Sequence, residues 1–152
     1  KINWKPNNKE TLQLFNKWKN GKTGYPYIDA NMIEMNKTGF MSNRGRQMVA
    51  SFLVKDLKID WRLGAEYFES VLIDYDVASN YGNWNYSAGI GADPREDRYF
   101  NVYKQANTYD SDCKFILKWI PELKTNNKKD ILNVNNLENY ISQVIKIKKF
   151  YK

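Results

Sequence analysis

Histidine is missing from this chain of 152 residues, and cysteine occurs once. Histidine is the usual general base near neutral pH and a common zinc ligand, so its absence argues against histidine-based acid–base catalysis and against a metal site. The single Cys113 has no partner for a disulfide within the chain and no identifiable activating neighbour, which favours a reducing compartment. We therefore expect neither a metal centre nor thiol chemistry.

Long apolar runs are missing as well. No stretch approaches the roughly 20 apolar residues that span a bilayer, so we expect no membrane partner. The chain starts at a lysine and has no signal-peptide pattern, and we interpret it as part of a longer protein that carries any targeting region elsewhere. The expected location is the cytoplasm, or an organelle in a eukaryote.

Charge is unevenly distributed along the chain. Residues 1–60 carry eleven Lys/Arg against five Asp/Glu, residues 61–123 six against ten, and residues 124–152 seven against two, for a net charge of +7. A basic front and tail around an acidic middle suit binding of a polyanion on one face. The alternative is a solvated surface that is simply rich in lysine and asparagine.

Helix start and stop signals recur, whereas no alternating strand pattern emerges. Asn8, Pro26 and Ser42 or Asn43 mark helix starts, and Gly21 and Gly39 mark helix ends. Further along, Asp110-Ser111-Asp112 predicts the cap of a helix that runs to Trp119 before Pro121 stops it. Apolar stripes at helical spacing predict the core faces of the third and fourth helices: Val49, Phe52, Leu53, Leu57, Leu63, Tyr67, Phe68, Val71 and Leu72.

The end of the chain has a different composition. Lys124 to Asp130 is typical of a polar linker, and apolar residues then recur at Leu137, Tyr140, Ile141, Val144 and Ile145. We predict an all-α helical bundle in residues 1–123, followed in residues 124–152 by a polar linker and a basic amphipathic C-terminal helix.

Three ordered motifs carry the clearest functional signal. Residues 38–47 read TGFMSNRGRQ, residues 74–76 read DYD and residues 80–86 read NYGNWNY. With their surroundings from Gly21 to Leu123, about two thirds of the chain, they resemble the C-terminal, FAD-binding half of the photolyase and cryptochrome family. Gln47 and Tyr86 resemble the DASH branch of that family. The resemblance implies that the all-α bundle corresponds to the C-terminal part of the photolyase FAD-binding domain.

The resemblance implies that FAD is the cofactor. It places Asp76 at the isoalloxazine ring and Asn80 at the flavin N5, and it pairs Arg46 with Asp74. The full implied set of FAD-binding residues is Asn43, Arg46, Asp74, Tyr75, Asp76 and Asn80. Without the family, Arg46 and Asp74 would be an ordinary buried salt bridge, and the Asp-x-Asp-x3-Asn pattern a capped helix.

Tryptophans supply the implied electron-transfer path to the photoexcited flavin. Trp84 matches the member nearest the flavin, Trp61 matches a second family motif, and Trp4 is the candidate at the surface. Together with Asn80, they are the residues to which the resemblance assigns catalysis. The alternative for Trp61 and Trp4 is core packing, because indole rings are large apolar fillers.

The implied nucleic-acid surface combines basic, amide and aromatic residues. Arg44 is placed on a phosphate, Gln47 and Tyr86 at the lesion pocket, and Arg98 and Gln105 along the backbone-binding rim. Gln47 and Tyr86 stand where we expect methionine and tryptophan in duplex-acting photolyases. This more polar pair fits a preference for single-stranded DNA, where a lesion needs less energy to leave the stack. Arg44 and Arg98 could otherwise be solvated surface charges.

Three functional hypotheses follow. The first is a DASH-type photolyase that repairs cyclobutane pyrimidine dimers, in a parent protein of which this chain is an FAD-binding fragment. The second is a cryptochrome photoreceptor, or a flavoprotein that binds DNA or RNA without repair turnover. The third is a helical fragment without a cofactor. The family's antenna chromophore belongs to an N-terminal domain outside this chain, so we expect the missing N-terminal half as a partner and incomplete FAD binding by the fragment alone.

Overall fold

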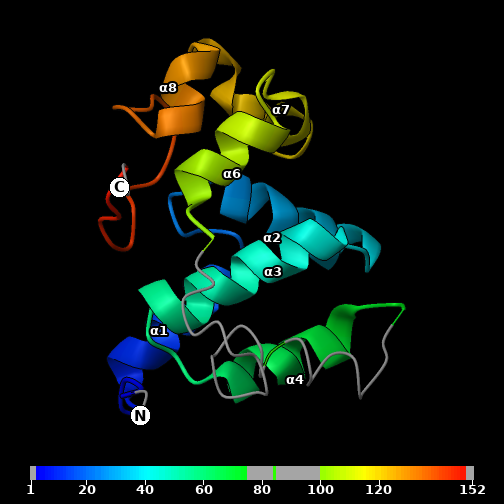
Figure 1. Ribbon diagram of the computed structural model, residues 1–152, viewed down its shortest axis with the longest axis vertical. Helices are drawn as coiled ribbons and strands as arrows, with labels where there is room; N and C mark the ends of the chain where they lie inside the picture. Colours follow the sequence, from blue (N-terminus) through cyan, green and yellow to red (C-terminus); the bar gives the residue numbers. More distant parts are fainter. Residues whose placement is uncertain (1–2, 75–83, 85–99, 150–152) are drawn as a thin grey trace.

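The computed structural model describes residues 3–74, 84 and 100–149. Every regular element in these ranges is a helix, which confirms the predicted all-α class (Figure 1). None of these helices is both long and apolar enough to cross a bilayer. The elements are α1 (Lys9–Lys19), α2 (Pro26–Thr38), α3 (Asn43–Ser51), η1 (Phe52–Asp56), α4 (Trp61–Val71), α6 (Val102–Tyr109), α7 (Lys114–Trp119), η2 (Pro121–Thr125) and α8 (Lys128–Asn133).

The predicted helix boundaries in the first half are confirmed. The side chain of Asn8 accepts a hydrogen bond from the backbone of Thr11 at the start of α1, and Pro26 is the first residue of α2. Ser42 caps α3 by accepting from the backbone N–H of Gly45 at 3.0 Å. Gly39 ends α2 with φ at +74°, a left-handed conformation that glycine adopts without strain.

Asp110, one of the residues predicted to cap this helix, caps the N-terminus of α7. Both carboxylate oxygens of Asp110 accept backbone hydrogen bonds, from Phe115 at 3.0 Å and from Ile116 at 2.9 Å. These amides belong to the first turn of α7, where backbone N–H groups have no partner within the helix. The cap therefore fixes α7 against the end of α6.

A π-helical turn extends α3. In η1 the backbone N–H of Leu57 bonds to the carbonyl of Phe52 at 2.9 Å, a spacing of five residues. Leu53 and Leu57 are fully buried. The wider turn thus continues the apolar face of α3 to the point where the chain reverses toward α4.

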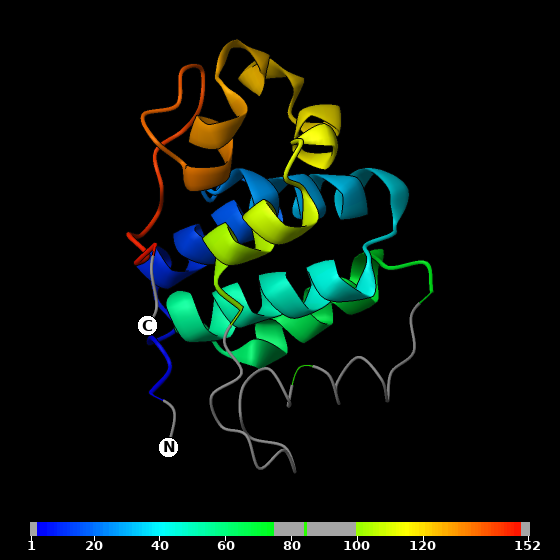
Figure 2. The ribbon, with the colours of Figure 1, turned by 45° about the horizontal axis from the view of Figure 1, so that its top comes forward.

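The helices form one packed body around α2. This helix contacts α1, α3, α6, α7 and α8, whereas α4 contacts η1. In Figures 1 and 2, α3 lies between α4 on one side and the group formed by α6, α7 and α8 on the other. Residues more than 60 positions apart in the sequence, on α3 and α6, are thereby brought to one side of the molecule.

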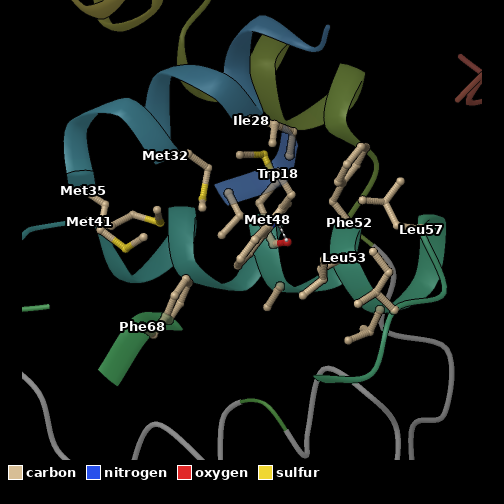
Figure 3. Packing of buried hydrophobic residues seen from close by; sticks show 14 of the residues in the cluster. Trp18, Ile28, Met32, Met35, Met41, Met48, Phe52, Leu53, Leu57 and Phe68 are labelled. Atoms are coloured by element: carbon tan, nitrogen blue, oxygen red, sulfur yellow. Dashed lines mark hydrogen bonds between the residues drawn. The ribbon is translucent and has the colours of Figure 1, made fainter. Parts of the chain in front are cut away.

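Sulfur-containing and aromatic side chains fill the main core. Met32 and Met35 of α2 meet Met41 and Met48 between α2 and α3, and all four are buried (Figure 3). Trp18 is also fully buried and donates its indole N–H to the carbonyl of Val49 at 3.1 Å. Burial of each such side chain stabilises the fold by about 1.5–3 kcal/mol, so α1, α2 and α3 are joined by a common apolar layer.

The predicted C-terminal secondary structure is wrong. The short helices η2 and α8 overlap the proposed linker, Lys124 to Asp130, and their buried Leu123, Ile131 and Leu132 pack in a second core with Ala30 of α2. Residues 134–149, which we call the C-terminal strap, contain no helix. Positive φ angles at Val134, Asn136 and Asn139 turn the chain repeatedly.

Hydrogen bonds to distant residues explain the shape of the C-terminal strap. The backbone N–H of Val144 bonds to the carbonyl of Thr23 at 2.9 Å, and the hydroxyl of Tyr25 donates to the carbonyl of Ile145 at 2.7 Å. A helix would have used these strap groups internally. The strap therefore lies against the turn that precedes α2.

Candidate flavin and nucleic-acid site

An ion pair joins Arg46 of α3 to Asp74, which lies three residues after the end of α4. Nη2 of Arg46 lies 2.8 Å and 3.0 Å from the two carboxylate oxygens of Asp74, and its Nε donates to the carbonyl of Met41 at 2.8 Å. The pairing predicted from the resemblance is therefore confirmed. The pair is not buried, however, because 59% of the Asp74 side chain is exposed, against 23% for Arg46.

The position of Arg46 suits a polar, partly anionic group such as FAD. Two contacts fix its guanidinium, so little side-chain entropy remains to be lost when a ligand binds. Asn43 is exposed three residues earlier, on the same face of α3. A fixed guanidinium and an exposed amide offer donors to flavin carbonyls or to phosphates. On donor chemistry, the described residues fit the cofactor.

Trp84 is deeply buried in an aromatic cluster, with 1% of its surface exposed. Its ring centroid lies 5.0 Å from that of Phe68 and 6.1 Å from that of Trp18, both in edge-to-face arrangements. Gly64 on α4 makes room for this ring, since a Cβ there would lie 2.3 Å from Cη2 of Trp84. The side chain is thus held in one orientation by its neighbours.

Trp61 and Trp4 are half-buried and pack against the same core cluster as Trp84. Trp61 is the first residue of α4, and Trp4 precedes α1. Both therefore lie between the buried aromatic cluster and the surface. Their role in electron transfer stays a prediction.

Three of the candidate nucleic-acid residues lie on two helices, α3 and α6. Arg44 is exposed and Gln47 half-buried on α3, while Gln105 is half-buried on α6. The guanidinium of Arg44 lies over the ring of Tyr109, 3.7 Å from its centroid. Gln105 and Tyr109 are four residues apart on α6, so they share a helix face. The first turn of α3 and the last turn of α6 thus meet at the Arg44–Tyr109 contact, whereas the side-chain oxygen of Gln105 is buried without a hydrogen-bond partner.

Five predicted site residues lie outside the described residues. They are Tyr75, Asp76 and Asn80 of the flavin set, and Tyr86 and Arg98 of the nucleic-acid set. Their assignments stay predictions.

Sequence reasoning did not single out Tyr109 or Trp18. The ring of Trp18 on α1 lies 6.1 Å from that of Trp84, a contact between distant parts of the chain. Tyr109 looks like any surface tyrosine in the sequence, and its one signal is its spacing of four residues from Gln105. Contacts between α3 and α6 could not be read from local patterns.

The thiol of Cys113 is not activated. It is fully buried, and burial together with the nearby Asp110 carboxylate raises its pKa to about 11. A thiol with so high a pKa is almost entirely protonated at neutral pH and is a poor nucleophile. Its place in the second core accounts for it as an apolar filler.

The chain belongs to the family of FAD-binding domains of DNA photolyase, whose model matches residues 1–152. The match includes the C-terminal strap, which the resemblance seen in the sequence had not covered.

Proteins named cryptochrome DASH are similar in sequence to this chain. Cryptochrome DASH of Oryza sativa, named as chloroplastic/mitochondrial, is 59% identical over 135 residues, which are 89% of this chain and 23% of that protein. Cryptochrome DASH of Synechocystis is 66% identical over 110 residues, 72% of this chain and 22% of that protein. The chain thus spans between a fifth and a quarter of these relatives.

Solved structures share the fold. A cryptochrome of Synechocystis superposes with a TM-score of 0.86 at 48% identity, covering 95% of this chain and 32% of that chain. An archaeal photolyase from Sulfolobus tokodaii, solved with two FAD molecules, gives 0.87 at 41% identity, covering 95% and 33%.

Proposed function

We propose that this chain is part of a longer, FAD-dependent, blue-light-driven photolyase of the DASH type. In that protein it would supply part of the flavin pocket and part of the surface that binds single-stranded DNA carrying cyclobutane pyrimidine dimers. The proposal extends the family membership to an activity, and it rests on the residues of α3 together with the names of the relatives.

The observation that carries the proposal is that side chains of α3 have contacts on two different sides of the helix. Arg46 pairs with Asp74, and Asn43 lies three residues before it on the same helix face, whereas Arg44 lies over the ring of Tyr109 on α6. One short helix therefore presents donors for a cofactor and a cation for a phosphate in different directions. Such an arrangement brings a nucleic acid and a flavin close together without making them share side chains.

When bound, FAD supplies light-driven electron donation, and the protein's task is to hold and tune it. Arg46 would bind its polar edge, fixed in place by Asp74 and the carbonyl of Met41. The buried Trp84, held by Phe68 and Gly64, would supply a fixed redox-active ring beside the pocket. Arg44 would hold the DNA backbone, with Gln47 and Gln105 donating or accepting nearby.

The single-strand preference follows from the residues at the proposed lesion pocket. Gln47 is half-buried on α3 and offers an amide, and Tyr86 offers a smaller apolar area than tryptophan would. A pocket with less apolar contact gains less free energy from an extruded lesion. It would therefore act best where the lesion is already unstacked.

A second candidate function is photoreception, or binding of DNA or RNA, without repair. The curated relatives carry the name cryptochrome, and the aromatic cluster around Trp84 could support flavin photoreduction without repair of a substrate. The plant relatives also suggest an organelle as the site of action, with the cytoplasm as the alternative.

Light-dependent repair by the full-length parent protein tests the proposal. The substrate is an oligonucleotide with one cyclobutane dimer, presented single-stranded or in a duplex, under blue light and in the dark. The proposal expects repair in the light alone, and faster repair of the single strand. Bound but unrepaired substrate would favour the second candidate, and equal or faster duplex repair would contradict the DASH assignment.

A further inference from the structure

Arg44 and Tyr109 form a stacked pair that links α3 to α6. The guanidinium carbon lies 3.7 Å from the ring centroid, although the two residues are far apart in the sequence. Arg44 belongs to the first turn of α3, and Tyr109 is the last residue of α6. The start of α3 and the end of α6 lie at the same side of the molecule (Figure 2).

Core packing does not account for Tyr109. Half of its surface is exposed, and Arg44 is exposed as well. An exposed ring contributes little apolar burial to stability. The ring is instead positioned to hold a cation, in a geometry that contributes about 0.5–1 kcal/mol at exposed sites.

No acidic group neutralises Arg44 within the described part of the chain, where the ion pairs involve Arg46 and Arg62. Asp110 directly follows Tyr109, but its two oxygens accept from the backbone of α7. Tyr27, also close to Arg44, is neutral near pH 7, and burial raises its pKa further, to about 12. The positive charge of Arg44 therefore remains available.

Stacking uses the face of a guanidinium and leaves its N–H edge free for bonding in the plane. This edge can bind a phosphate with two parallel hydrogen bonds. A free arginine side chain would lose rotamer entropy when it formed such bonds. A ring that already holds the guanidinium reduces that cost.

We propose that Tyr109 is a positioning residue for nucleic-acid binding, which holds the Arg44 guanidinium so that its edge meets a backbone phosphate. This inference rests on the proposed function, because the phosphate contact of Arg44 belongs to it. It adds a residue of α6 to the surface and explains why an exposed tyrosine ends that helix.

A double-mutant cycle tests the inference. The affinity of the chain for a labelled single-stranded oligothymidylate is measured by fluorescence anisotropy, for wild type, Arg44→Gln, Tyr109→Leu and the double variant. Tyr109→Phe keeps the ring, and Tyr109→Gln is a second variant without it. Arg62→Gln is the charge control, since it removes a cation that pairs with Asp60 on α4. Thermal melting checks that each variant is folded.

Loss of the ring should raise Kd by about two- to fivefold, the range that corresponds to an exposed cation–π contact. Tyr109→Phe should bind as wild type does. In the Arg44→Gln background, Tyr109→Leu should have no further effect, because the ring acts through Arg44. Arg44→Gln should also lower the salt dependence of log Kd by about 0.7, whereas Arg62→Gln should not.

The outcomes separate the inference from the function on which it rests. If Arg44→Gln weakens binding but ring loss does not, or weakens it equally in both backgrounds, Tyr109 is not a positioning residue and the phosphate contact stands. If Arg44→Gln binds as Arg62→Gln does, the proposed phosphate contact is wrong and the inference fails with it.

Discussion

The position of Trp84 depends on Gly64, whose lack of a side chain leaves room for the indole ring. Gly64 lies within α4, where an alanine would favour the helix by about 1 kcal/mol. Its Cβ would nevertheless lie 2.3 Å from Cη2 of Trp84 and 2.7 Å from a methyl group of Leu53. Because both neighbours are buried, neither can move away without disturbing the core.

Replacing Gly64 with alanine should therefore destabilise the protein. We expect a loss of about 1–3 kcal/mol in the free energy of unfolding, the usual cost of overpacking a core. The measurement is urea denaturation followed by tryptophan fluorescence, which also reports any change around Trp84. Glu69→Ala, at an exposed position on α4, is the matched control and should have little effect. An unchanged stability in Gly64→Ala would contradict the packing described here.

For individual residues, the sequence could predict some contacts of the candidate site but not others. The Arg46–Asp74 pair was predicted because both residues fall on family motifs, and it is present. Without the family, the pair would have been interpreted as a buried salt bridge, yet 59% of the Asp74 side chain is exposed. The Arg44–Tyr109 stack depends on how α3 and α6 pack, and no local pattern encodes that distance.

Among the elements, the helices of the first half were predictable because their boundaries are local. Asn8, Pro26, Gly39 and Ser42 act within one turn of their own helix. The C-terminal strap was predicted wrongly because its apolar spacing resembles that of a helix. Its backbone instead bonds to Thr23 and Tyr25, which lie more than 110 residues away.

A buried carboxylate anchors the C-terminal strap at the first turn of α2. Asp29 is fully buried and accepts hydrogen bonds from the backbone of Thr23 at 2.9 Å, from its hydroxyl at 2.7 Å and from the backbone of Gly24 at 3.1 Å. The strap adds a fourth donor, the hydroxyl of Tyr140. Burial raises the pKa of Asp29 to about 6, although these donors lower it.

The raised pKa gives a pH dependence with a defined sign. The folded state holds the Asp29 proton more tightly than the unfolded chain does, where the ordinary value is 3.8. The stability that comes from this group is therefore fully present below about pH 4 and is lost as pH rises through about 6.

Tyr140→Phe should alter this profile, because it removes one donor to the carboxylate. We expect a cost of about 1 kcal/mol at low pH and about 1.5–3 kcal/mol where Asp29 is ionised, since hydrogen bonds to charged groups are stronger. Urea denaturation across the acid-to-neutral range measures both. Tyr109→Phe, which removes an exposed hydroxyl, is the control. A cost that is the same at every pH would show that Tyr140 does not act on the charged form of Asp29.

At the scale of the whole molecule, the charge distribution favours a small surface that binds a polyanion. The chain carries a net charge of +7, yet residues 61–123 are acidic overall. Arg44 lies on α3 in the basic first part, and its neighbour Tyr109 lies in the acidic middle. Folding therefore brings a cation from the basic first part next to a residue of the acidic middle part.

Nucleic-acid binding should accordingly be sensitive to salt but carried by few contacts. We expect log Kd for single-stranded DNA to rise with log salt concentration with a slope of about 1.4, which corresponds to the two arginines, Arg44 and Arg98, that are assigned to the DNA backbone. An oligonucleotide with an uncharged backbone is the control and should bind weakly at every salt concentration. A slope near zero would exclude phosphate contacts as the source of affinity.

The central claim is that α3 and Asp74 supply part of an FAD site, and thermal melting of the chain with increasing FAD tests it most directly. A ligand that binds the native state raises stability in proportion to RT ln(1 + [L]/Kd). We predict a rise in Tm at high FAD concentration that is lost in Arg46→Gln and retained in Arg62→Gln. Equal shifts in wild type and Arg46→Gln, or no shift in wild type, would contradict the claim.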